Sequence, residues 1–223
     1  MIGRRDRGEP DSRARLVMLQ APEGAAANAY RLALTTVLPD EHAADAPRRM
    51  MVVAVDASAD GPIATANLAV AAAATGARTV LVDCNLRRPR LHALLGVENV
   101  RGLSTIAGGS EPAGCLVPTD VAGLAVLPAG PSSSGGVDVL ARQNVSDAVK
   151  AATTDADLVL ISCAPFSEGP DAILVSRWID TAILVLSGRG TRRADGTRAK
   201  EQLERAGVHI LGAIFFRDGP GAR

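Results

Sequence analysis

The chain contains six short apolar segments, separated by longer segments with the composition of helices and turns. Within each segment nearly every residue is apolar, a pattern typical of strands buried on both faces. Because helices between consecutive strands imply parallel crossovers, we expect an α/β fold with an open, mostly parallel sheet and helices on both faces. The predicted strands are residues 50–55, 78–83, 124–127, 157–163, 181–187 and 208–215.

Helices are predicted before the first strand and between the others. Gly76 and Gly96 mark two helix ends, and Pro89 suits the first turn of a helix. Residues 101–120 show only short helical pieces and loops, and residues 128–136 form a polar turn. The predicted helices are residues 23–38, 63–77, 89–95, 137–153, 170–177 and 192–206.

Length and composition fit one globular domain. The 223 residues are 47% hydrophobic and 22% charged, and their net charge of zero gives no support to a nucleic-acid partner. We expect a polar, flexible arm at residues 1–22, the domain at residues 23–216 and a tail at residues 217–223. The start of the chain is too charged for a signal peptide, and no apolar run reaches the ~18–20 residues of a membrane span. A cytoplasmic location is therefore expected. The three cysteines have no metal-site spacing, and no metal is expected.

Residues 50–67 predict a strand, a tight loop and the start of a helix. This is the layout with which P-loop proteins hold the phosphates of a nucleotide. The loop contains no lysine and no series of glycines, and Pro62 stands where the helix would offer a backbone N–H. The sequence thus predicts the frame of a nucleotide site without its chemistry.

Seven segments within residues 23–216 share their order and spacing with one protein family. They are AYRLALTTVL (29–38), ATANLAV (64–70), VLVDCNLRRPRLHALLGV (80–97), GLSTIAGG (102–109), LAVLPAGP (124–131), DLVLISCAP (157–165) and DAILVSRWIDTAILVLSG (171–188). They resemble the cytoplasmic domain of the bacterial tyrosine autokinases of capsule and exopolysaccharide synthesis. Those domains are P-loop proteins of the class that includes the ParA/MinD-type ATPases. LRRPRLHALLG together with LPAGP favours the autokinase branch.

The resemblance identifies the positions of the phosphate loop. Counting back from Asn67, the family's lysine position is Gly61 and its Mg²⁺-binding hydroxyl position is Pro62. Asp56 and Asp60 place negative charge where a triphosphate requires positive charge. The degenerate loop of the nucleotide site comprises Asp56, Ser58, Asp60, Gly61, Pro62 and Ile63.

The other nucleotide motifs also depart from the family pattern. Of the two aspartates expected after the second strand, Asp83 is present and the other is Asn85. At the position of the aspartate with which the family holds its metal ion, this chain has Ser162. At the position of an asparagine that contacts adenine in the family, it has Phe216. Because the charge clamp and most of the metal ligands are replaced together, we expect no catalytic residue and no bound ATP or Mg²⁺.

The family's assembly helix is also altered. Its Glu-x-x-Arg-x-x-Arg motif aligns with Asn28, Arg31 and Leu34, so only the middle arginine is retained. The tyrosine-rich tail of intact members is absent, and Tyr30 is the single tyrosine. Its place in the helix favours a packing role over a role as phosphate acceptor.

One basic cluster remains open to two interpretations. Arg87, Arg88 and Arg90, with His92, could contact a phosphate, a lipid headgroup or an acidic partner helix. Alternatively, the three arginines pair with nearby acids and hold their loop in place. The second interpretation is the simpler one.

Three functions are compatible with these observations. The first is a catalytically inactive, tyrosine-autokinase-like protein that acts as a regulatory or scaffold subunit in polysaccharide synthesis or export. Its partner would be a membrane chain-length regulator or an active kinase paralogue, through which it would associate peripherally with the membrane. The second is an atypical kinase or ATPase that uses Arg87, Arg88 or residues supplied by a partner. The third is a crevice adapted to another small molecule.

Overall fold

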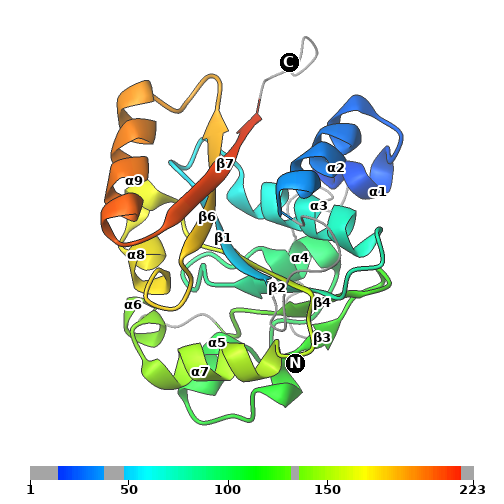
Figure 1. The fold of residues 1–223 in the computed structure, drawn as a ribbon. Helices are drawn as coiled ribbons and strands as arrows, with labels where there is room; N and C mark the ends of the chain where they lie inside the picture. The colour runs from blue at the N-terminus through cyan, green and yellow to red at the C-terminus, as the bar shows by residue number, and fades with distance from the viewer. Residues whose placement is uncertain (1–14, 38–47, 132–135, 217–223) are drawn as a thin grey trace, which may run out of the picture.

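The computed structural model describes residues 15–37, 48–131 and 136–216. Within these residues the core is a seven-stranded sheet of order β3-β4-β2-β5-β1-β6-β7, in which every neighbouring pair is parallel except β3 with β4 (Figure 1). The expected mostly parallel α/β sheet is confirmed. The strands are β1 (Arg48–Ala54), β2 (Thr79–Asp83), β3 (Val117–Pro118), β4 (Leu124–Leu127), β5 (Leu158–Ser162), β6 (Thr181–Ser187) and β7 (His209–Phe216).

Helices cover both faces of the sheet, as the continuous apolar strands predicted. Helices α1 to α4 pack on one face and α5 to α9 on the other, so the sheet separates two apolar cores. Alternate residues of a strand enter different cores: Met50 and Val52 face α3, while Met51 and Val53 face the opposite side. The helices are α1 (Val17–Gln20), α2 (Ala25–Val37), α3 (Gly61–Ala73), α4 (Leu91–Leu95), α5 (Leu103–Ala107), α6 (Gly136–Leu140), α7 (Gln143–Ala152), α8 (Asp171–Val175) and α9 (Arg193–Arg205).

Helix α3 is the central element of its face. It is buried on almost every side, because it lies between the sheet and the pair α1 and α2. Its sequence from Gly61 is dominated by alanine, and these small side chains allow a helix to be enclosed all round. Asn67 in the middle of α3 accepts the N–H of Met18 at 3.0 Å, which fixes α1 against it.

The expected flexible arm at residues 1–22 is wrong for residues 15–22. Leu16 is fully buried, Met18 is 5% exposed, and α1 packs on α2 and α3. Burial of these apolar side chains stabilises the segment, which its charged surroundings in the sequence concealed. Residues 1–14 and the expected tail at 217–223 lie outside the described residues.

Two further elements differ from the expectation. The single helix predicted at residues 137–153 is two helices, α6 and α7, because Arg142 is extended (φ −78°, ψ 130°). No glycine or proline marks this break; it allows both Leu140 and Val145 to be buried. Strand β3 was not predicted, since two residues paired antiparallel to β4 give no periodic signal.

Candidate functional site

The carboxyl ends of β1, β2 and β5 lie side by side at one end of the sheet. Strand β5 lies between β2 and β1, and the register places Ser162 beside both Asp83 and Val52. The loops at residues 55–60, 84–90 and 163–170 leave from these ends. They form the crevice position at which α/β proteins of this topology bind ligands. Phe216 ends β7 at the same end of the sheet, with β6 between it and β1.

Asp56 forms hydrogen bonds within the loop that follows β1. Its Oδ1 accepts the N–H of Ser58 at 2.7 Å and also a short hydrogen bond from the Ser58 hydroxyl, while its carbonyl accepts the N–H of Ala59 at 3.2 Å. Burial works to raise the pKa of Asp56, but hydrogen bonds from Ser58, Thr191 and two backbone N–H groups hold that pKa below its usual value. The carboxylate therefore occupies donors at the start of the loop.

Asp60 has the same effect at the start of α3. Its Oδ1 accepts the N–H of Ile63 at 3.3 Å, so that Asp60 is the N-cap of the helix. The N–H of Gly61 donates to the Ala59 carbonyl at 3.0 Å, and Pro62 has no N–H to offer. Backbone donors at residues 58, 59, 61 and 63 are thus engaged within the loop.

Two arginines neutralise Asp60. Arg15 Nη2 lies 2.7 Å from Asp60 Oδ2, and Arg90 Nη1 lies 3.0 Å from Asp60 Oδ1. Arg15 comes from the segment before α1 and Arg90 from the loop after β2. The ion pairs connect both segments to the loop in which the family resemblance places the phosphates.

The turn between β6 and α9 covers the same loop. A Cβ atom built on Gly190 would lie 2.1 Å from Ser58 Cβ, closer than atoms can approach. Only a glycine fits here, because the turn rests directly on Ser58. This contact leaves little freedom for the loop to move outward on that side.

Asp83 is a buried carboxylate held by backbone groups. It is 1% exposed, its Oδ2 accepts the N–H groups of Arg90 and Leu91 at 3.0 Å each, and its Oδ1 accepts the N–H of Asn85 at 3.1 Å. Burial raises the pKa of Asp83 to about 6, against these hydrogen bonds and the charge of Arg90, which lower it. Its described hydrogen bonds shape the loop at residues 84–90.

Asn85 makes a hydrogen bond within its own loop, whereas the described residues offer no partner to the Ser162 side chain. Asn85 Oδ1 accepts the N–H of Arg88 at 3.1 Å. Ser162 is fully buried, and its hydroxyl has no hydrogen-bond partner among the residues that the structure describes. In the same ranges, no three His, Cys, Asp or Glu side chains are grouped closely enough to hold a metal ion.

Each arginine of the basic cluster pairs with an acid, as the simpler interpretation predicted. Arg87 Nη2 lies 2.7 Å from Asp171 Oδ2, and Arg88 forms a short ion pair with Glu168. With the pair between Arg90 and Asp60, the loop after β2 is joined to the loops after β1 and β5. The cluster holds the three crevice loops together.

Tyr30, on α2, is packed in the apolar core, as expected. It is 8% exposed, and burial together with the charge of Asp60 raises its pKa to about 12, despite a hydrogen bond with Asn67. Arg31 Nη1 donates to Asn28 Oδ1 at 2.7 Å, and Leu34 is buried, so two of the three positions aligned with the assembly motif remain on the surface.

Sequence reasoning missed two residues of this site. The sequence predicts Arg15 as part of the flexible arm. Only its position directly before the apolar stretch at residues 16–19 indicates that this part of the chain packs on the domain. Glu168 has no motif; it reaches Arg88 because β5 and β2 are neighbours in the sheet. Gly169 accompanies it, since a Cβ there would lie 2.9 Å from Arg87 Nη2 and 2.7 Å from Asp171 Oδ2.

Solved structures with the same architecture define the class. The chain superimposes with a TM-score of 0.83 on the chimerical protein CapA2B2 (22% identity; 93% of this chain and 91% of that chain). It does so equally on the kinase domain of *Escherichia coli* tyrosine kinase ETK (23% identity; 99% and 85%). For the septum site-determining protein MinD of Pyrococcus horikoshii, complexed with Mg-ADP, the TM-score is 0.68 and the identity is 25%, over 79% of this chain and 72% of that chain. The fold is therefore that of the P-loop ATPase-like α/β proteins.

Sequence comparison narrows the class to one group. The tyrosine-protein kinase wzc of *Salmonella typhi* is 30% identical over 176 residues, which cover 77% of this chain and 24% of that protein. The tyrosine-protein kinase YwqD of *Bacillus subtilis* is 27% identical over 219 residues, 96% of this chain and 90% of that protein. The homologues of this chain are bacterial tyrosine-protein kinases. The chain spans about a quarter of the length of the *Salmonella* protein. No family model matches the chain.

Proposed function

We propose that this chain is a catalytically inactive relative of the bacterial tyrosine-protein kinases that acts as a binding or scaffold subunit. The observation that carries the proposal is the internal bonding of the loop after β1. Asp56 and Asp60 accept backbone N–H groups that a phosphate would need, and Arg15 and Arg90 neutralise Asp60. The loop contains its own anions.

Replacement of the residues that act on the nucleotide supports the same proposal. By the family resemblance, Gly61 and Pro62 stand in the places of the lysine and the metal-binding hydroxyl. Neither can supply a positive charge or a ligand for Mg²⁺. The residues present therefore do not fit a nucleoside triphosphate with its metal.

The proposed setting is capsule or exopolysaccharide synthesis or export, in which the resemblance places the family. The partner would be a membrane chain-length regulator or an active kinase paralogue at the inner face of the membrane. No helix in the described part of the chain has the length and apolar character that crossing a bilayer requires. The proposal includes peripheral association with the membrane through that partner.

Nucleotide binding is the first test. In isothermal titration calorimetry of the whole chain with ATP, with and without Mg²⁺, we expect no binding heat at micromolar ATP. The kinase domain of *E. coli* ETK, measured alongside, supplies the positive control. Micromolar, Mg²⁺-dependent binding by this chain would contradict the proposal.

The two alternatives have less support in the contacts. An atypical kinase that uses Arg87 or Arg88 would have to release them from Asp171 and Glu168. Phosphate release in the presence of a candidate partner, abolished by Arg87→Ala, would favour it. A different ligand in the crevice would be detected by a thermal-shift screen of nucleotides, sugar nucleotides and polyphosphates.

A further inference from the structure

Strand β7 presents a free edge within the part of the chain that the structure describes. It is the outermost strand, with β6 as its neighbour in the described sheet. The N–H of Gly188 donates to the Phe216 carbonyl at 2.9 Å, so the backbone groups of Phe216 point toward β6. Because these groups alternate along a strand, those of Ala213 and Phe215 point to the open edge.

After a register shift at Leu211, the remaining half of this edge lacks the features that usually prevent pairing with another chain. Residues 210–216 include no charged residue and no proline, and Phe215 is 57% exposed. The register shifts between Ile210 and Gly212, which leaves Leu211 as the extra residue, and residues 212–216 pair regularly with β6. Natural edge strands usually carry a lysine, a proline or a bulge in the exposed stretch. The regular half of β7 is therefore able to accept a further strand.

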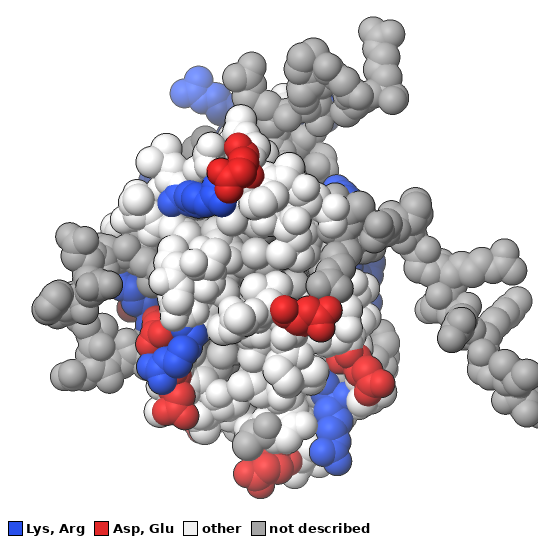
Figure 2. All heavy atoms as spheres, turned by 90° about the vertical axis from the view of Figure 1, so that its right-hand side faces the viewer, with Lys and Arg blue, Asp and Glu red and all other residues white. Residues whose placement is uncertain are grey.

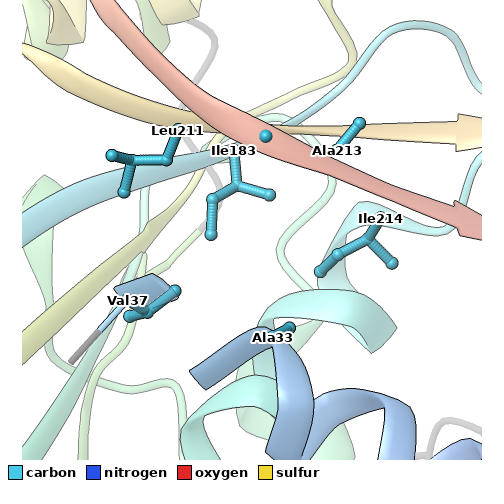
Figure 3. A pocket seen from close by; sticks show the side chains of 7 residues that line it. Ala33, Val37, Ile183, Leu211, Ala213 and Ile214 are labelled. Carbon is cyan, nitrogen blue, oxygen red and sulfur yellow. The ribbon is translucent and has the colours of Figure 1, made fainter. Parts of the chain in front are cut away.

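A small apolar pocket adjoins the same half of the strand. It lies between α2 and the pair β6 and β7 (Figure 3). Its volume is about 130 Å³, and Gly212 is one of the residues that border it. An apolar cavity of ~150 Å³ is large enough for a benzene ring. The lining residues are Ala33, Val37, Ile183, Leu211, Gly212, Ala213 and Ile214.

Neither a close contact nor a positive φ in the described chain requires a glycine at position 212. A Cβ built at this position meets nothing within 4 Å, and its φ lies outside the left-handed region. Glycine in a strand interior weakens the strand and often marks a bulge or a place where a ligand or another backbone approaches closely, and Gly212 directly follows the register shift at Leu211. The open space beside Gly212 is available to a side chain from outside.

We propose that a second copy of this chain pairs antiparallel with β7 about a two-fold axis at Ile214. Opposite residues must lie on the same side of the sheet, which this register satisfies. Gly212 then faces Phe216 of the second copy, and Ala213 faces Phe215. Each large ring meets a small residue, and Ile214 meets its own equivalent on the axis. The outward backbone groups of Ala213 and Phe215 form the hydrogen-bonded pairs.

Charge and shape both favour a copy of the same chain as the occupant. A two-fold contact brings each residue near its own equivalent, so a charged residue in the strand would be repelled by the same residue of the second copy. Residues 210–216 carry none. On the side of the molecule that carries α1 and α2, charges of both signs are interspersed around an uncharged centre (Figure 2). A benzene-sized ring from the second copy also matches the pocket beside Gly212.

The association is tested by sedimentation velocity of the whole chain from low to high micromolar concentration. We expect a monomer–dimer equilibrium whose dissociation constant rises at least tenfold in Gly212→Val and in Ala213→Lys. Valine places a Cβ, which meets nothing within 4 Å in its own chain, and two methyl groups in the space for the opposite ring, and lysine brings two charges near each other. Ala29→Lys, at an exposed position of α2, is the matched control and leaves the equilibrium unchanged.

Cross-linking tests the register independently of those variants. Opposite residues in a non-hydrogen-bonded pair have Cα atoms about 4.5 Å apart, within the range of a disulfide. Ile214→Cys should therefore give a covalent dimer with diamide, whereas Ala29→Cys should not; the native cysteines are buried. The proposal would be overturned if the chain were a monomer at every concentration and Ile214→Cys formed no covalent dimer. A dimer unaffected by both β7 variants would overturn it as well. Nucleotide binding does not enter either result.

Discussion

Arg15 and Asp60 form an ion pair with 2.7 Å between Nη2 and Oδ2, although the sequence placed Arg15 in a flexible arm. Asp60 simultaneously caps α3 and pairs with Arg90. One carboxylate thus connects the segment before α1, the loop after β1 and the loop after β2. The loop that holds phosphate in a P-loop protein is here held by the protein's own side chains.

Three variants separate the contributions of Asp60. Arg15→Ala should lower the free energy of unfolding by at most about 1 kcal/mol, because the arginine is half exposed. Asp60→Ala should lower it by about 1–2 kcal/mol, since the helix cap and both ion pairs are lost. The loss of unfolding free energy in Asp60→Asn should lie between those of the other two variants, because asparagine is also a good helix cap. Urea unfolding measures all three, and an Asn variant as unstable as the Ala variant would argue against the cap.

The arginines of the crevice should differ in importance according to the burial of their partners. Asp171 has a side chain only 2% exposed, so Arg87→Ala leaves a buried carboxylate without its ion-pair partner and should cost about 2–4 kcal/mol. Arg88→Ala should cost less than about 1 kcal/mol, because Arg88 is 68% exposed. In the double variant Arg87→Ala/Asp171→Asn, part of the loss should be recovered. Equal losses for the two arginines in urea unfolding would contradict this ranking.

Asp83 should make stability depend on pH in an unusual direction for an acid. Its pKa is about 6 in the folded chain against an ordinary 3.8, so between these values the folded state binds more protons than the unfolded state. The contribution of this group is most favourable below about pH 4 and is lost as the pH rises through about 6, by a total on the order of 3 kcal/mol.

Asp83→Asn isolates this contribution. Asparagine does not titrate, so the difference in unfolding free energy between wild type and variant should shrink as the pH rises from about 4 to about 7. The variant should also be less stable at about pH 4.5, because an amide cannot accept all three backbone N–H groups. A difference that is constant over this pH range would show that Asp83 titrates normally.

Restoring the family's key residues should not restore nucleotide binding. In Gly61→Lys/Pro62→Thr, Asp56 and Asp60 still accept the loop N–H groups. A Cβ at residue 61 would also lie 3.2 Å from Ala54 Cβ, tight enough to require a small shift of the loop. We expect no calorimetric binding of Mg-ATP at micromolar concentration, with the double variant folded by circular dichroism. Micromolar affinity would show that the two substitutions alone had removed binding.

The sequence by itself determined the architecture, and its resemblance to the autokinase family gave the positions that align with the nucleotide site. Continuous apolar strands alternating with helices fix a buried parallel sheet, because strands covered on both faces need crossovers on both sides. Counting from Asn67 located Gly61 and Pro62, and the strand ends located Asp83, Asn85 and Ser162. The strands follow from local pattern, whereas the site positions follow from spacing within motifs that resemble those of the family.

Only the tertiary structure decided what those residues contact. The partners Arg15 with Asp60 and Arg88 with Glu168 lie far apart in sequence and meet because β2, β5, β1 and α1 are neighbours in space. The break at Arg142 and the burial of Leu16 likewise result from packing that no periodicity records. The open edge of β7 beside Gly212 is a further case, since a strand's position in the sheet is set by the order of all the strands.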